Sequence, residues 1–321
     1  TINETVKDFY QNGILNKHTE EVPNQWTGEL ETAVAYDHIY VASPGDMTTY
    51  QIAEVPPTEY ENLGAPADWK SQVDKENTII LIPVGALEQH GNQAPLGTDD
   101  IIAEAMVEYL GRALEEAGEK DFPILAFPVI PVGLSTEHRN FCGSVTLRPD
   151  TYYHLLYDIS VSLAHHGFKK LAFLVCHGGN APIVQVLSRE LRSELGISPF
   201  ILSSGAFGHP DVRATVSEGN VYDFHGGEME TSMVMAVDPS LVKLETAEAG
   251  IPTAFVGNQT LKTGGSVTIG WVSEDWKTAD GRPIGIGGDP SGATAEKGRI
   301  ILETSARVLV PGLREIRDWK A

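Results

Sequence analysis

Apolar residues follow two different spacings from residue 78 onward, and each spacing predicts a different kind of element. The run Thr78-Ile79-Ile80-Leu81-Ile82-Pro83-Val84 is apolar and β-branched, which is typical of a strand buried on both faces. Further runs of apolar residues predict strands at residues 122–130, 171–175 and 200–203. The two prolines in 122–130 indicate an edge strand or an irregular path.

Between these runs, apolar residues recur at the three- and four-residue spacing of amphipathic helices. One helix begins at Thr98 or Asp99, because either side chain can cap it. Three further helices are predicted from Pro149 to Gly167, from residue 181 to Gly196, and through Met233 to Val237. Strands that alternate with helices in this way predict an α/β fold with a largely parallel sheet covered on both faces.

Residues 1–75 lack this regular spacing and form a separate region of the chain. They are polar, with prolines at 56, 57 and 66, and they carry several aromatic residues. We interpret them as an N-terminal arm with short helices or strands, which packs on the body (76–321) or on a neighbouring subunit. Disorder is the alternative, and the aromatic residues disfavour it: Trp26, Tyr36, Tyr40, Tyr50 and Tyr60.

The formal net charge of −21 argues against two classes of binding partner. Binding to nucleic acid or to anionic membrane surfaces requires clustered Lys and Arg, so we expect neither partner. No apolar run approaches the length of a transmembrane helix, and the polar N-terminus lacks the apolar core of a signal peptide. The two cysteines, Cys142 and Cys176, fit a reducing compartment, and we therefore expect a cytoplasmic protein.

The first group of chemically capable residues follows the strand at 78–84. Glu88 and His90 are two apart and point to the same side of an extended segment, and Asp99 stands at the start of the next helix. Ligands of open α/β sheets bind beyond the carboxyl ends of the strands. One imidazole and two carboxylates suit zinc, manganese or iron. The alternative is that Glu88 and Asp99 cap turns and that His90 is an ordinary loop residue.

Two further groups lie at similar junctions. His177-Gly178-Gly179-Asn180 follows the strand at 171–175, where His177 is either a metal ligand or a core histidine, and Asn180 either caps the next helix or contacts a ligand. His225-Gly226-Gly227-Glu228-Met229-Glu230 leads into the last predicted helix. Glu228 and Glu230 are roughly 200° apart on a helix, so only one can face the crevice. Alternatively, both complement the positive end of the helix.

These segments also carry a family resemblance. PVGALEQHGNQAPLGTD (83–99), HGGN (177–180), HGGEMETS (225–232) and GGDPSGATAEKG (287–298) resemble the creatininase family of creatinine amidohydrolases. The likeness extends from about Thr78 to Ala321. It implies a three-layer α/β/α domain with a mainly parallel sheet, a homo-oligomer of hexameric type, and two divalent ions per subunit in a pocket at the strand ends.

The resemblance also implies individual roles. Glu88 and His90 would be terminal metal ligands, Asp99 the bridging carboxylate, His177 a further ligand and His225 a proton shuttle. Creatininase itself has a glutamate ligand where this chain has Gly179. We therefore predict that Glu230 replaces it as a ligand and catalytic carboxylate, with Glu228 as the second choice. His138, Asn180 and Glu228 are the candidate substrate contacts, although His138 fits a surface loop equally well.

The ligand set predicts a hydrolase in which a metal-activated water attacks a carbonyl group. By resemblance, the bond is a C–N bond in a small polar cyclic amide or a formamide. Asn92-Gln93-Ala94, which stands where many relatives have Pro-His-Leu, and the N-terminal arm weigh against creatinine itself. One alternative is hydrolytic C–C ring opening of a keto-inositol, and another is a non-catalytic metal- or sugar-binding protein. A serine hydrolase is disfavoured because the G-x-S-x-G pattern is absent, and Cys176 fits the core.

Overall fold

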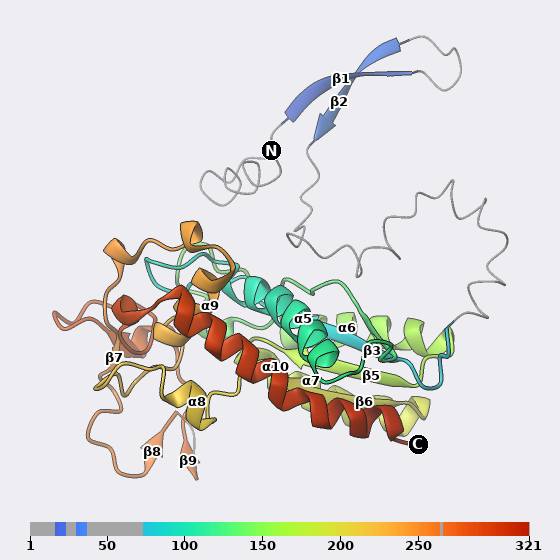
Figure 1. Ribbon diagram of the computed structural model, residues 1–321. Helices are drawn as coiled ribbons and strands as arrows, with labels where there is room; N and C mark the ends of the chain where they lie inside the picture. Colours follow the sequence, from blue (N-terminus) through green and yellow to red (C-terminus); the bar gives the residue numbers. More distant parts are fainter. Residues whose placement is uncertain (1–16, 24–29, 37–72, 264–265, 321) are drawn as a thin grey trace. The chain divides into compact units, whose positions relative to one another are not determined.

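The computed structural model describes residues 17–23, 30–36, 73–263 and 266–320 (Figure 1). The chain divides into two units, Thr1–Asp46 and Met47–Ala321. In the first unit, β1 (Lys17–Pro23) and β2 (Leu30–Tyr36) form an antiparallel hairpin. The predicted arm therefore contains short strands. Its packing on the body or on a neighbour stays a prediction, since most of its residues lie outside those described.

The second unit is built around a four-stranded parallel sheet. Its strand order is β4-β3-β5-β6, and each strand coincides with one of the predicted apolar runs. The strands are β3 (Ile79–Val84), β4 (Ile124–Ala126), β5 (Lys170–Val175) and β6 (Ser198–Ser203). β4 is shorter than the predicted 122–130 and lies at an edge of the sheet, which is where its flanking prolines are tolerated.

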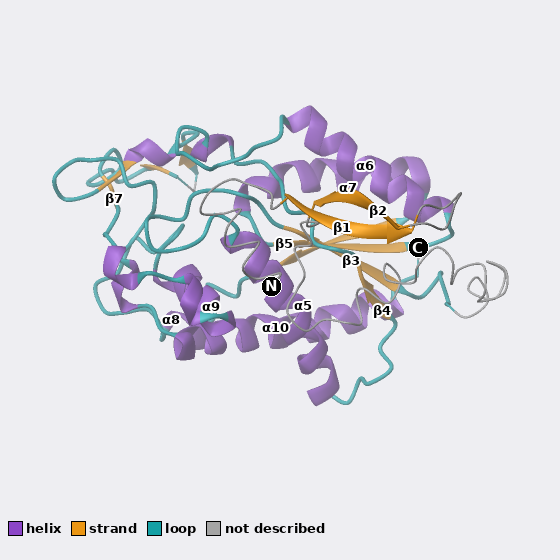
Figure 2. Ribbon diagram, turned by 90° about the horizontal axis from the view of Figure 1, so that it is seen from above, coloured by secondary structure: helices purple, strands orange, loops and turns teal. Residues whose placement is uncertain are grey.

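Helices cover both faces of this sheet (Figure 2). α6 (Pro149–His165) and α7 (Ala181–Leu195) pack against each other on one face. α5 (Thr98–Glu116) and α10 (Ala295–Asp318) cover the other face, and α9 (Glu228–Val237) packs on both of them. The predicted three-layer α/β/α architecture is confirmed. Among the described residues, no helix is long and apolar enough to cross a membrane.

The core explains why β3 is apolar at every position. Ile79 and Leu81 belong to the cluster formed with α5 and α10, whereas Ile80, Ile82 and Val84 belong to the cluster formed with α6 and α7. Every residue of β3 is buried. Side chains that alternate between two buried faces leave no position for a polar residue, so the polar residues of this segment begin only where the strand ends.

The crossing of α9 and α10 fixes where the first turn of α9 lies. Gly298 of α10 has no Cβ, and a Cβ there would overlap the carbonyl oxygen of Ser232 on α9. This close approach brings Lys297, the residue before Gly298, against Glu228. Glu228, one of the two acids in the first turn of α9, therefore forms an ion pair with α10.

Two expected helix caps are wrong. Gly97, not Thr98 or Asp99, is the N-cap residue of α5, and the Thr98 hydroxyl donates to the carbonyl of Pro95. Asn180 precedes α7, but its side chain makes no capping hydrogen bond. A local hydrogen bond takes the Thr98 side chain away from its helix end, and tertiary contacts with Leu134 and Gly85 do the same for Asn180.

The remaining elements are short and lie mostly in the segment between α9 and α10. The helix α8 (Pro210–Arg213) follows β6. The strands β7 (Ile251–Pro252) and β10 (Trp276–Lys277) pair with each other, as do β8 (Leu261–Lys262) and β9 (Val267–Thr268). Single 3-10 turns occur at Thr136–His138, Gly178–Asn180, Pro239–Leu241, Leu244–Thr246, Ser273–Asp275 and Pro290–Gly292.

Candidate metal centre

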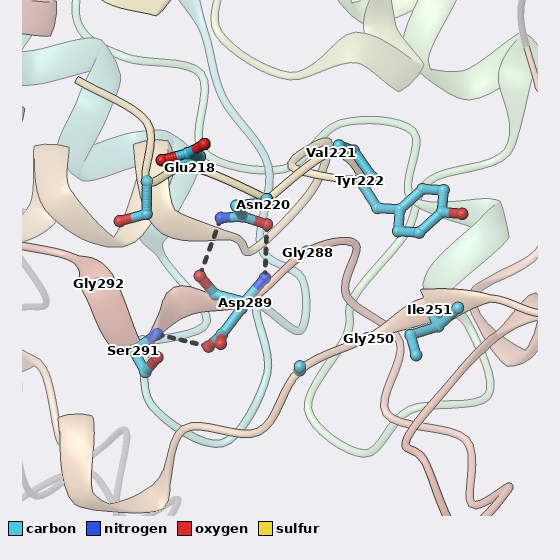
Figure 3. A pocket seen from close by; sticks show the side chains of 13 residues that line it. Glu218, Asn220, Val221, Tyr222, Gly250, Ile251, Gly288, Asp289, Ser291 and Gly292 are labelled. Carbon is cyan, nitrogen blue, oxygen red and sulfur yellow. Dashed lines mark hydrogen bonds between the residues drawn. The ribbon is translucent and has the colours of Figure 1, made fainter. Parts of the chain in front are cut away.

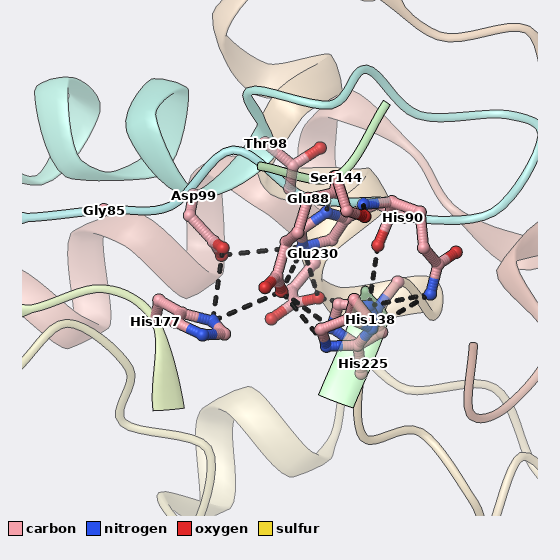
Figure 4. A network of polar contacts seen from close by, with 12 residues as sticks. Gly85, Glu88, His90, Thr98, Asp99, His138, Ser144, His177, His225 and Glu230 are labelled. Atoms are coloured by element: carbon pink, nitrogen blue, oxygen red, sulfur yellow. Dashed lines mark hydrogen bonds and ion pairs between the residues drawn. The ribbon is translucent and has the colours of Figure 1, made fainter. Parts of the chain in front are cut away.

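Imidazole and carboxylate side chains converge beyond the carboxyl ends of β3 and β5 (Figure 4). The loop after β3 and the start of α5 supply one part of the group, and the second residue after β5, His177, supplies another. The first turn of α9, His225 three residues before that helix, and the 3-10 turn after β4 complete it. We call this group the strand-end cluster: Glu88, His90, Asp99, His138, His177, His225 and Glu230.

Asp99 lies between two imidazoles. Its Oδ1 is 3.5 Å from His90 Nε2, and its Oδ2 is 3.4 Å from His177 Nδ1. Glu88 Oε1 lies 3.2 Å from the same His177 nitrogen, and Glu230 Oε2 lies 3.6 Å from His90 Nε2. His177 thus lies at one oxygen of Asp99 and His90 at the other, while Glu88 Oε1 approaches both imidazoles, 3.2 Å from His177 Nδ1 and 4.0 Å from His90 Nε2.

His138 and His225 stand on a further side of Glu88. His138 Nε2 is 3.4 Å and His225 Nδ1 is 3.6 Å from Glu88 Oε1, and the centroids of the two rings are 4.1 Å apart. Potential ligand atoms of Glu88, His138 and His225 lie within 4.8 Å of one another, as do those of Glu88, His90 and Asp99. The cluster therefore offers more than one way to surround a cation.

Backbone carbonyls orient the imidazoles. His177 Nε2 lies 2.6 Å from the carbonyl oxygen of Leu134, and His225 Nε2 lies 2.8 Å from that of Gln89. His90 Nδ1 lies 3.1 Å from the carbonyl oxygen of Glu88. A carbonyl can only accept, so each of these nitrogens carries the proton, and the other nitrogen of each ring directs its lone pair into the cluster.

Burial leaves several of these atoms without a partner. Glu88 and His90 are 0% exposed and Asp99 is 2% exposed. Glu88 Oε1 and Oε2, His90 Nε2 and Asp99 Oδ2 are buried and have no hydrogen-bond partner. Buried carboxylate oxygens and imidazole lone pairs without donors are costly unless a cation neutralises them. These residues fit one or more divalent metal ions.

The pKa values express the same excess of negative charge. Burial lowers the pKa of His90, but Asp99, Glu230 and Glu88 outweigh it and raise the pKa to about 10. Burial also lowers the pKa of His177, but Glu88, Asp99 and Glu137 outweigh it and raise the pKa to about 10. For Glu88, the neighbouring imidazoles overcome burial and hold its pKa well below the usual range. The carboxylates thus demand positive charge, from protons or from metal ions.

The imidazoles farther from Asp99 behave differently. Burial lowers the pKa of His138 to about 4, and burial together with His138 and His90 lowers that of His225 well below its usual value. Burial raises the pKa of Glu230 to about 7. At neutral pH, His138 and His225 are therefore uncharged.

The two acids of the first α9 turn diverge, as the helical spacing predicts. Glu230 enters the strand-end cluster, whereas the structure does not bring Glu228 there. Glu228 pairs with Lys297 Nζ and accepts hydrogen bonds from Ser217 Oγ at 2.7 Å and Asn220 Nδ2 at 3.0 Å. We call these residues the Glu228 cluster. Ser217 and Asn220 line a pocket of about 440 Å³ that no member of the strand-end cluster lines (Figure 3).

Asn180 holds two loops together behind His177. Its Nδ2 donates to the carbonyl of Gly85 at 2.9 Å, and its Oδ1 accepts from the backbone N–H of Leu134 at 2.9 Å. Both ends of the amide are therefore occupied by backbone. The sequence correctly places Asn180 beside the site, but its hydrogen bonds are structural rather than directed into the strand-end cluster.

Two polar residues beside the cluster are absent from the sequence-based candidates. Gln89 Nε2 donates to His138 Nδ1 at 3.2 Å, and the backbone carbonyl of Gln89 accepts from His225 Nε2 at 2.8 Å, so this residue contacts both uncharged imidazoles. Glu137 Oε1 lies 3.7 Å from His177 Nε2. Their neighbours in sequence, His90 and His138, were the available signals. An aromatic side chain, Trp271, also lies with its ring 5.7 Å from that of His138.

Comparison with known proteins gives a consistent result. The creatininase (creatinine amidohydrolase) family model matches residues 67–311. The mycofactocin precursor peptide peptidase of Mycobacterium ulcerans is 30% identical over 234 residues, which cover 72% of this chain and 82% of the relative. The 3-dehydro-scyllo-inosose hydrolase of Thermotoga maritima is 24% identical over 258 residues, 76% of this chain and 79% of that one. A solved structure described as "Creatininase Mn" is 25% identical with a TM-score of 0.59, covering 78% of this chain and 95% of that chain.

Proposed function

This chain belongs to the creatininase family, and from that premise we propose that it is a divalent-metal-dependent hydrolase acting on a C–N bond of a small polar cyclic substrate. The observation that carries the proposal is the set of buried, partnerless ligand atoms on Glu88, His90 and Asp99. A site meant only for stability would pair these atoms internally, because each unpaired buried polar group lowers stability by about 1–3 kcal/mol.

The geometry supports a site for two ions, because His90 and His177 face opposite oxygens of the Asp99 carboxylate. Glu88, which approaches His177, would help to hold one ion, and Glu230, which approaches His90, would help to hold the other. Zinc, manganese and iron all suit imidazole and carboxylate ligands. When bound, such ions polarise a substrate carbonyl and lower the pKa of water.

His225 is suited to move the proton. Its Nε2–H donates to the carbonyl of Gln89, so the proton-accepting atom is Nδ1, which faces Glu88. This hydrogen bond holds the His225 ring in one orientation. A neutral imidazole held in one orientation can take a proton from an attacking water and pass it to a leaving nitrogen.

One wall beside the cluster suits a ring-shaped substrate. The ring of Trp271 packs against His138, and Phe224 packs against Trp271 with ring centroids 5.4 Å apart. His138 Nδ1 contacts Ser273 Oγ, which holds the imidazole in place. We propose that these aromatic side chains contact the face of the substrate ring and that His138 holds them beside the cluster.

The C–N bond is favoured because the family model and the peptide peptidase both name enzymes that cleave C–N bonds. The second candidate is hydrolytic C–C ring opening of a carbocyclic ketone, which the dehydro-inosose hydrolase supports. Both reactions require a polarised carbonyl beside the same ligands.

A substrate screen with controlled metal loading tests the proposal. The protein is stripped with a chelator, reloaded with Zn²⁺, Mn²⁺ or Fe²⁺, and assayed on cyclic amides, formamides, short peptides and keto-inositols. Metal-dependent turnover of an amide is the expected result. Turnover of keto-inositols alone would favour the second candidate, and turnover that survives complete metal removal would refute both.

A further inference from the structure

Residue 179 has no space for a side chain, although it stands two positions after His177 in the turn that follows β5. A Cβ atom there would overlap the carbonyl oxygen of Leu134 and His177 Nε2, and it would lie 2.8 Å from Glu137 Oε1. The space beside His177 is thus already occupied. Part of it is filled by a carboxylate that comes from a different segment, the 3-10 turn Thr136–His138 after β4.

The two nitrogens of His177 have distinct surroundings. Nδ1 faces Glu88 Oε1 at 3.2 Å and Asp99 Oδ2 at 3.4 Å, on the side of the proposed ion. Nε2 faces the opposite way, 2.6 Å from the Leu134 carbonyl and 3.7 Å from Glu137 Oε1. The Glu137 side chain is only 19% exposed, so water screens this second contact weakly.

We propose that Glu137 is a positioning residue that holds His177 for the ion shared with Glu88. The inference rests on the proposed function. The Leu134 carbonyl accepts the proton of the outer nitrogen, and the Glu137 carboxylate, 3.7 Å from the same nitrogen, stabilises that N–H electrostatically and makes the inner nitrogen a better donor to a cation. Glu137 thereby acts through His177 and complements Glu230, which serves the His90 side.

The test compares the full-length protein with its Glu137→Gln variant, which keeps the size of the side chain and removes its charge. Glu115→Gln is the matched control, because Glu115 is exposed on α5 and the charge change is identical. Each metal-free protein is titrated with Co²⁺ and followed by visible absorbance, and its melting temperature is measured before and after loading.

Glu137→Gln is expected to bind one Co²⁺ with the wild-type affinity and the other about 10-fold more weakly, at the low end of the effect of removing a carboxylate behind a ligating histidine, because Glu137 contacts His177 without a hydrogen bond. Its metal-free melting temperature should match that of the wild type, and the control should bind both ions normally. Unchanged affinity for both ions, or equal weakening of both with a lower metal-free melting temperature, would overturn the inference. Failure of the wild type to bind any Co²⁺ would instead overturn the proposed function itself.

Discussion

Glu228 and Glu230 lie two residues apart in the first turn of α9, yet they belong to two different kinds of polar cluster. In the Glu228 cluster, Lys297, Ser217 and Asn220 all donate to one carboxylate, and Ser217 does so through its backbone N–H as well as its hydroxyl. In the strand-end cluster, carboxylates meet other carboxylates and imidazole lone pairs, and several buried atoms have no donor.

The difference separates a structural site from a chemical one. Burial raises the pKa of Glu228, but Lys297, Asn220 and Ser217 reverse this effect and lower it below the usual value. The ion pair therefore neutralises itself within the fold. In the strand-end cluster, by contrast, the pKa values of His90 and His177 are raised. The reason is that its carboxylates have no Lys or Arg partner within the cluster. Only the second arrangement takes up positive charge from outside the fold, as protons on its imidazoles or as metal ions.

The largest expected effect follows from Asp99→Asn. The variant keeps the shape of the side chain but removes the charge that lies between His90 and His177. We expect loss of bound metal and a fall in hydrolytic rate of at least about 1000-fold, roughly 4 kcal/mol in the barrier. Metal analysis and turnover on the substrate found by the screen measure both. Full metal content with full activity would show that the cluster is not the metal centre.

Glu228→Gln, in the Glu228 cluster, should reduce stability but leave metal binding intact. Bound metal should be retained, while the free energy of unfolding should fall by about 3 kcal/mol, because removing one partner leaves Lys297 without its buried counter-charge. Denaturant unfolding of the metal-free protein measures the change. The double variant Glu228→Gln with Lys297→Met should recover part of the loss. Loss of metal from Glu228→Gln would erase the proposed distinction between the clusters.

The two clusters should differ in how their contributions to stability change with pH. His90 and His177 have pKa values raised from 6.5 to about 10, so their contribution to stability is present below pH 6.5 and is lost as pH rises towards 10. The pKa of Glu228 is lowered, so its contribution is lost only in acid. We therefore expect the melting temperature of the metal-free protein to fall by a few degrees between pH 7 and pH 10. A metal-loaded sample should resist this fall, and equal losses in both samples would contradict the assignment.

The sequence predicts the frame of the fold because its elements have a regular pattern. β3 is apolar at every position because both of its faces are buried. The long C-terminal helix α10 escapes such prediction, since Pro311 and Gly312 interrupt its pattern with residues that normally end helices. Packing of Ile301, Leu302 and Leu313 in the core outweighs this local preference.

The sequence predicts the part of the candidate site that lies at the ends of regular strands. β3 and β5 are neighbours in the parallel sheet, so the residues that follow them, Glu88 and His177, must meet at one edge. Glu137 and Trp271 come from segments without regular spacing, and no pattern in the sequence places them beside that edge. Their positions depend on how irregular loops close over the site, which follows from tertiary packing rather than from local sequence.

The smallest expected effect comes from Ser217→Ala, which removes one of several donors to Glu228. Glu228 Oε1 would keep Lys297 Nζ, and Oε2 would keep Asn220 Nδ2 and the backbone N–H of residue 217. The unfolding free energy should therefore fall by less than about 1 kcal/mol, the net contribution of one hydrogen bond, with metal content unchanged. Denaturant unfolding beside Glu228→Gln measures the ratio of the two effects. A loss from Ser217→Ala as large as that from Glu228→Gln would mean that the cluster has no redundancy. Complete pairing would then not be what distinguishes it from the strand-end cluster.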